Sequence, residues 1–258
     1  MDYPVFKEEM KSSYTILIPD MLPIHFKLII NILKKYGYHV ELLQTSTRAV
    51  VDEGLKNVHN DTCYPALLVI GQFINALKSG KYDVNRTALM LTQTGGGCRA
   101  SNYIHLLRKA LKKEFPQVPV ISLNLSGLEK GSGLSLTLPL LIKVVYAVFY
   151  GDLLMSLYNQ CKPYEIHSGE SESVREKWQE KLTTIFDKRE FIKCKKYCRM
   201  ILEDFDKIER TKEKKIRVGI VGEIYVKYSP LANNHLEEFL LSEGCEPIVP
   251  ALMEFVMY

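Results

Sequence analysis

Apolar stretches of two different periods alternate at the start of the chain. YTILIPD (14–20) predicts a short buried strand, and HFKLIINILKKYG (25–37) repeats apolar residues at helical spacing before a terminating glycine. YHVELLQ (38–44) predicts a second strand. Because a helix between two strands normally returns the chain to the same edge of a sheet, this order predicts a parallel sheet covered by helices.

The same alternation continues through the next eighty residues. It predicts a helix at 65–80, a strand at 87–93, a helix at 101–115 and a strand at 118–125. We therefore expect residues 1–130 to form an α/β domain, a doubly wound, Rossmann-like parallel sheet.

The pattern changes after residue 130. Residues 131–214 are predicted to be a mostly helical connector, interrupted by a polar loop, HSGESES (167–173). Residues 215–258 are expected to open a second α/β domain, truncated here because the apolar run ALMEFVMY has no closing helix. Its elements are predicted as a strand at 216–224, a helix at 234–244 and a strand at 245–250.

Composition narrows the class of protein. Six cysteines in 258 residues and an N-terminus without an apolar signal core favour a reducing, cytoplasmic location. The net charge of +4 is mild, and acidic residues interleave with the basic ones at 188–217, so nucleic acid is not an expected partner. The apolar segment 134–158 is broken by Pro139, Lys143 and Asp152, and we expect a buried helix rather than a membrane span.

Two cysteines stand at predicted strand-to-helix junctions. Cys63 lies in NDTCYPA, just before the proline that suits a first helical turn, and Cys98 follows three glycines in TQTGGGCRAS. The positive end of a helix macrodipole favours a thiolate, which is the form that binds metal. Gly95, Gly96 and Gly97 would let backbone N–H groups approach a bulky anion such as an iron–sulfur cluster.

The pattern alone leaves other interpretations open. The two cysteines could be buried structural thiols or a reactive thiol, and the triple glycine could hold a phosphate, although it lacks the Lys-Ser/Thr ending of a P-loop. Cys194 and Cys198 are four residues apart on a predicted helix, a spacing that is more often incidental than metal-binding. Cys161 and Cys245 are interpreted as packing residues.

Three segments together resemble the 2-hydroxyacyl-CoA dehydratase family: NDTCYPALLVIGQ, QTGGGCRASNYIHLLRKAL and VGIVGEIYVKYSPLANN. The similarity runs from about residue 12 to the end. The segments look closest to large proteins described as acyl-CoA dehydratase activase-related, and they also resemble the 2-hydroxyglutaryl-CoA dehydratase D-component. In the activase-related proteins, a dehydratase-like module follows ATPase domains, and this chain resembles the amino-terminal part of that module.

The resemblance implies a function. Dehydratase subunits of this family are Rossmann-like and use three cysteines to hold a [4Fe-4S] cluster. An ATP-dependent activase supplies one electron at low potential, which passes to a hydroxyacyl-CoA thioester and permits loss of water. By position, Cys63 and Cys98 match the first two cluster ligands. Residues 222–225, GEIY, match the opening of the second domain, where Glu223 could reach the crevice or cap a turn.

The third cluster cysteine of the family has no counterpart, and we expect it outside this chain. The resemblance thus implies an anaerobic, iron–sulfur lyase module completed by the rest of a dehydratase, with an activase and possibly an acyl-CoA as partners. We assign Cys63 and Cys98 as metal ligands, and Gly95, Gly96, Gly97, Arg99 and Asn102 as residues surrounding the cofactor. No catalytic residue is assigned, and a non-catalytic scaffold or electron-relay module is the alternative.

Overall fold

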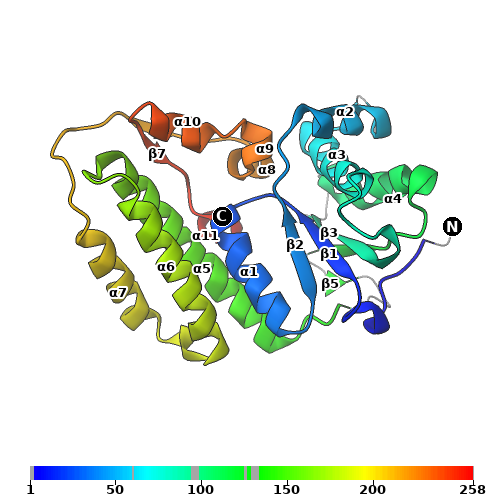
Figure 1. The fold of residues 1–258 in the computed structure, drawn as a ribbon, viewed down its shortest axis with the longest axis horizontal. Coiled ribbons are helices and arrows are strands. Elements are labelled where there is room, and N and C mark those ends of the chain that lie inside the picture. The colour runs from blue at the N-terminus through cyan, green and yellow to red at the C-terminus, as the bar shows by residue number, and fades with distance from the viewer. Residues whose placement is uncertain (1–2, 60, 94–98, 125–126, 129–133, 258) are drawn as a thin grey trace. The chain divides into compact units, whose positions relative to one another are not determined.

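A computed structural model describes the chain except for residues 1–2, 60, 94–98, 125–126, 129–133 and 258. The chain divides into two compact units, and each contains segments that are distant in the sequence (Figure 1). Unit 1 comprises residues 1–20 and 36–136, and unit 2 comprises residues 21–35 and 137–258.

Unit 1 is built on a parallel sheet in the strand order β2-β1-β3-β4. Its strands are β1 (Thr15–Pro19), β2 (His39–Leu43), β3 (Thr87–Gln93) and β4 (Val120–Asn124), with the short β5 (Gly127–Leu128) antiparallel to β4. All four parallel strands were predicted within about two residues of their bounds. Strand β2 pairs with one edge of β1 and β3 pairs with the other edge. The order in which strands are added to the sheet therefore changes direction at β1.

Both faces of the central strands are buried, as expected of a parallel sheet. In β1 the consecutive residues Ile16, Leu17 and Ile18 are buried, and in β3 so are Leu89 and Met90. Continuous apolar runs, rather than alternation, were the sequence signal for these strands.

The described residues of unit 1 form three α-helices: α2 (Arg48–Asn57), α3 (Tyr64–Lys78) and α4 (Tyr103–Glu114). Helix α2 was not predicted, because it buries only Val50 and Gly54 and its remaining residues are largely polar. It packs directly on α3, where a Cβ added at Gly71 would collide with the Val50 carbonyl oxygen. The two backbones therefore approach so closely that only glycine fits there.

Three long helices of unit 2 lie in the segment that was predicted to be mostly helical: α5 (Leu138–Cys161), α6 (Glu170–Asp187) and α7 (Cys194–Asp206). A fourth helix, α1 (Pro23–Lys35), packs against α5 and α6 and buries Leu28, Ile32 and Leu33 (Figure 1). The wholly buried Trp178 of α6 donates its indole N–H to Asp204 of α7, which ties these two helices together.

The predicted loop at 167–173 is shorter than expected because α6 begins at Glu170. The Glu165 carboxylate accepts hydrogen bonds from the backbone N–H groups of Gly169 and Ser171 and from the Lys162 ammonium. Burial by itself would raise the pKa of Glu165, but these hydrogen bonds outweigh it and lower the pKa to about 2. This charged acceptor satisfies N–H groups where the helix starts.

The C-terminal part of unit 2 contains a two-stranded parallel sheet, β6 (Arg217–Gly219) with β7 (Glu246–Ile248). The predicted strand at 216–224 was too long, because the chain turns after Gly219 and α8 (Ile224–Tyr228) begins. Short helices α9 (Pro230–Asn233) and α10 (Leu236–Ser242) connect the strands. The expectation that no helix follows β7 was wrong, since α11 spans Leu252–Met257.

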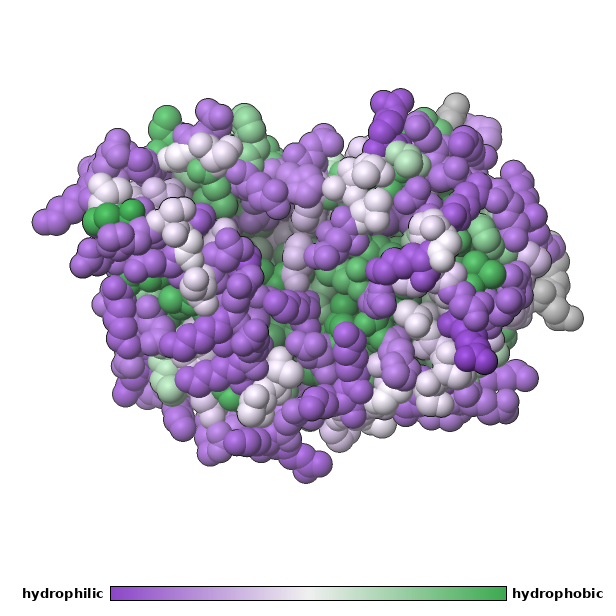
Figure 2. Space-filling view, viewed as in Figure 1, coloured by the Kyte–Doolittle hydropathy of each residue, from purple (hydrophilic) through white to green (hydrophobic). Residues whose placement is uncertain are grey.

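Helix α5, together with the 3-10 turn that follows it, is the described segment whose length and mean hydropathy of 1.7 would suffice to cross a membrane. The core helix of a globular protein can meet the same two criteria of length and hydropathy. In α5 the middle residues Ala147, Tyr150 and Leu154 are fully buried, whereas Leu138 and Val145 nearer its start are more than half exposed. Across the face drawn in Figure 2, polar and charged residues predominate.

Candidate functional site

Cys63 occupies the N-cap of α3, directly before its first turn. Its backbone is extended (φ −65°, ψ 149°), and Pro65 stands in the first turn as the sequence predicted. The carbonyl of Cys63 accepts the N–H of Ala66, and its side chain makes no capping hydrogen bond. The thiol is partly exposed and free of any disulfide, so it is available as a ligand.

Helix α3 is fixed to the carboxyl ends of two strands by one buried amide. The Gln72 Oε1 atom accepts the backbone N–H of Asp20, which follows β1, and its Nε2 donates to the carbonyls of Leu43 and Thr45 at the end of β2. Since Gln72 is only 1% exposed, these bonds are shielded from water. They hold the helix that begins with Cys63 against the sheet.

The segment that follows Cys98 contacts Asp61 and Cys63, which belong to the short segment before α3 that we call the Cys63 loop. The Arg99 guanidinium donates a hydrogen bond of 2.8 Å to the backbone carbonyl of Asp61. The hydroxyl of Tyr103, the first residue of α4, is hydrogen-bonded to the Cys63 sulfur at 2.6 Å. The two cysteine motifs, more than thirty residues apart in sequence, are therefore joined through Arg99 and Tyr103.

In the motif TQTGGGCRAS, the described part of the chain resumes at Arg99 with a 3-10 turn, Arg99–Asn102. Helix α4 therefore starts later than predicted. Asn102 is exposed and its side chain makes no capping bond to α4. Arg99 is exposed and bonds to a backbone carbonyl rather than to a carboxylate. The predicted residues Gly95, Gly96, Gly97 and Cys98 lie outside the described part of the chain.

The other described cysteines have separate surroundings in unit 2. Cys161 is buried and lies 3.7 Å from the Arg210 guanidinium, and burial raises the pKa of its thiol. Cys194 is 3.6 Å from the Tyr150 hydroxyl. Burial likewise raises the pKa of Cys198, and Cys245 contacts only a backbone carbonyl among the partners described. Within the described residues, no three His, Cys, Asp or Glu side chains form a metal-binding group.

Glu223 takes the second of the two roles considered for it. Its carboxylate accepts the backbone N–H of Val226 at 3.0 Å and caps α8. Gly222 before it has a positive φ of 145°, a conformation that favours glycine. The GEIY segment is thus a turn followed by a capped helix.

Searches of family models, of curated proteins and of solved structures each found no match to this chain.

The sequence did not predict that Gln72 and Tyr103 hold the Cys63 segment in place. Gln72 is a single amide within the apolar helix YPALLVIGQFINALK, and a polar residue on a buried helix was the available signal. Tyr103 lies in the predicted helix that follows Cys98, and its contact with Cys63 is visible only in the tertiary structure.

Proposed function

We propose that Cys63 and Cys98 are ligands of a shared [4Fe-4S] cluster in a protein of the 2-hydroxyacyl-CoA dehydratase type. The observation that supports this most directly is the pair of contacts from Arg99 and Tyr103 to the Cys63 loop. Arg99 follows Cys98 immediately in the sequence, and Tyr103 lies five residues beyond it. Contacts of this kind are expected where two ligand loops approach one centre.

The sheet topology supports the same proposal. A strand order of β2-β1-β3-β4 is that of a Rossmann-like, doubly wound sheet, in which ligands bind beyond the carboxyl ends of the strands where the chain changes direction. Cys63 begins the helix that leads into β3, and residues 94–98 directly follow β3. We further propose that β6 and β7 open a second α/β domain, because a two-stranded sheet is marginal alone.

Each described residue has a chemical role in this proposal. Cys63 is a free, partly exposed thiol at a helix N-terminus, which suits a thiolate ligand. The Tyr103 hydroxyl is placed to donate to that sulfur, and hydrogen bonds to cluster sulfurs adjust the reduction potential. A cluster bound there supplies one electron at low potential. An ATP-dependent activase would be the electron donor, a hydroxyacyl-CoA the substrate, and the remaining ligand would come from a further domain or partner.

Anaerobic reconstitution of the full chain with iron and sulfide tests the proposal. We expect absorbance near 400 nm with wild-type protein and its loss in Cys63→Ser, in Cys98→Ser and in the double variant. Cys245→Ser is the matched control, because Cys245 is also a free, partly exposed thiol. If the absorbance is absent, or is the same in the double variant as in the control, the cluster assignment is wrong.

A further inference from the structure

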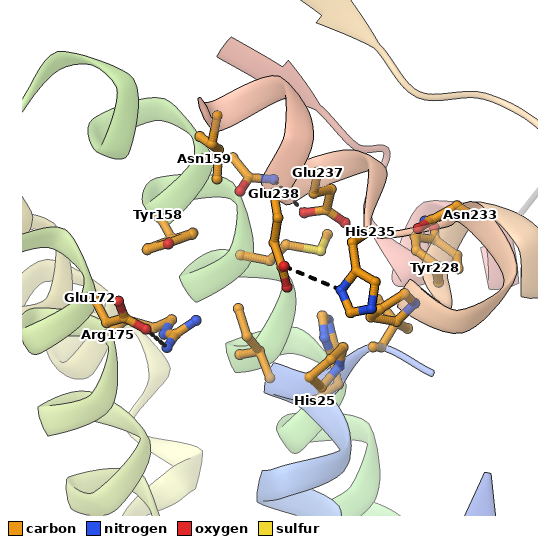
Figure 3. A pocket seen from close by; sticks show the side chains of 16 residues that line it. His25, Tyr158, Asn159, Glu172, Arg175, Tyr228, Asn233, His235, Glu237 and Glu238 are labelled. Atoms are coloured by element: carbon orange, nitrogen blue, oxygen red, sulfur yellow. Dashed lines mark hydrogen bonds and ion pairs between the residues drawn. The ribbon is translucent and has the colours of Figure 1, made fainter. Parts of the chain in front are cut away.

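A second site lies wholly within unit 2, where a cavity of about 350 Å³ opens between helices (Figure 3). Residues from α1, α5, α6 and the segment Tyr228–Leu241 line it. The volume lies within the range of small-molecule sites. Two lining residues that are not glycine, Leu22 and His235, have positive φ angles of 51° and 57°. Such conformations are uncommon and recur at binding sites.

The charged side chains that line the cavity are mostly carboxylates. They are Glu172, Glu237 and Glu238, against one guanidinium, that of Arg175. Arg175 is already paired with Glu172 at 2.8 Å and lies over the ring of Tyr158. The two histidines of the lining, His25 and His235, are paired with Asp152 and Glu238. The unbalanced charge in the cavity is therefore negative.

Glu237 carries most of this imbalance. Its carboxylate accepts a hydrogen bond of 3.1 Å from the neutral amide of Asn159, and no basic residue in the described part of the chain forms an ion pair with it. Burial is the main cause that raises the pKa of Glu237. Figure 3 draws Glu237 and Glu238 on the α10 side of the cavity, across from the pair Glu172 and Arg175. A partly buried carboxylate without a cation is a costly arrangement unless a ligand supplies one.

A hydrogen-bonded pair on α1 and α5 adds a buried polar atom without a partner among the described residues. The fully buried His25 bonds through Nε2 to Asp152 at 2.8 Å, and Asp152 also accepts the backbone N–H groups of Leu252 and Met253. Because the Asp152 carboxylate is an acceptor, Nε2 of His25 donates in this bond. Nδ1 of His25 is buried and has no hydrogen-bond partner among the described residues. Gly151 allows this packing, since a Cβ there would collide with the imidazole.

From the charge of the lining and the unpartnered Nδ1 atom of His25, we propose that this cavity binds a small molecule bearing a protonated primary amine, with the ammonium group against Glu237. An ammonium offers three N–H donors and a positive charge, which is what the lining lacks. Glu238, whose side chain is 74% exposed, contributes less because water screens it. All the residues that line this site belong to unit 2.

Calorimetric titration of the full chain with 1,5-diaminopentane tests the proposal. Size-matched 1,5-pentanediol and glutarate provide neutral and anionic comparisons. We expect saturable binding of the diamine alone. Glu237→Gln keeps the shape and removes the charge, and we expect it to weaken binding about 10-fold or more. Glu180→Gln, on the exposed side of α6, is the matched control and should bind as the wild type does.

A second variant guards against a folding defect in Glu237→Gln. Leu241→Trp fills the cavity from its rim without changing any charge, and we expect it to abolish binding while circular dichroism stays unchanged. Equal binding of the diamine and the diol, or unchanged diamine binding in both Glu237→Gln and Leu241→Trp, overturns the proposal.

Discussion

The cysteine loops of unit 1 and the cavity of unit 2 differ in how their residues are distributed along the chain. The cysteine motifs are two compact sequence segments, each directly before a helix. The cavity takes its residues from α1, α5, α6 and the segment around α10, more than two hundred residues apart at the extremes. A site made of local motifs is visible in a sequence, whereas a site assembled from single residues on many elements is visible only after folding.

The two sites also differ in what stabilises them. The Cys63 loop is attached at its surface by Arg99 and Tyr103. The cavity depends on the buried His25–Asp152 pair, which connects α1, α5 and the start of α11. Loss of the buried His25–Asp152 pair should therefore cost more folding free energy than loss of a contact at the cysteine loop, and the following variants compare the two regions.

The largest effect is expected for Asp152→Ala. It leaves the buried His25 imidazole and the N–H groups of Leu252 and Met253 without an acceptor, and it should lower the free energy of unfolding by about 3 kcal/mol. Urea denaturation measures this. Asp206→Ala, which removes a carboxylate that is 84% exposed, should change stability by less than about 0.5 kcal/mol. Equal losses in the two variants would contradict the buried role of Asp152.

Two glycine substitutions compare the units directly. A Cβ would collide with the Val50 carbonyl in Gly71→Ala and with the His25 ring in Gly151→Ala. Each should destabilise the protein by about 2 kcal/mol. Gly151→Ala should also abolish diamine binding, whereas Gly71→Ala should spare it. Gly219→Ala has open space around the new methyl group and serves as the control.

A smaller effect of opposite sign is expected for Glu237→Gln. Burial raises the pKa of Glu237, so the folded state favours the protonated carboxyl and the ionised form costs stability at neutral pH. The variant should be more stable than wild type by about 1 kcal/mol at pH 7. That gain should disappear below pH 4.5, where the carboxyl is protonated in both states. Thermal unfolding measured across this pH range checks the sign; a gain that persists at low pH would exclude this cause.

The smallest effect on stability is expected for Tyr103→Phe, which removes one hydrogen bond at the edge of the cysteine loop. The loss should be about 1 kcal/mol or less. In reconstituted protein, the loss of a donor to the Cys63 sulfur should make the reduction potential more negative. Redox titration measures this, and Tyr82→Phe, which loses an exposed bond to Glu41, should leave the potential unchanged.

The sequence predicted most of the regular structure of unit 1 because its signals are local. Apolar runs such as TILIP and TALML are typical of strands buried on both faces, and Pro65 with Cys63 before it marked the start of α3. Helix α2 was not predicted because it lacks a broad apolar face, and its close packing on α3 depends on the glycines Gly54 and Gly71. In α1 the spacing of the apolar residues predicted a helix, but this spacing does not indicate that the helix packs against α5 and α6.

The sequence by itself determined most of the strands and long helices, although not α2 or α11, and it drew attention to Cys63 and Cys98, because periodicity and turn residues act over a few positions. Only the tertiary structure decided that Tyr103 bonds to Cys63, that His25 pairs with Asp152 and that Glu237 lines a cavity with a neutral amide as its hydrogen-bond partner. The physical reason is that hydrogen bonding and burial depend on distance in space, and residues 40 to 127 positions apart come within that distance only when their helices pack.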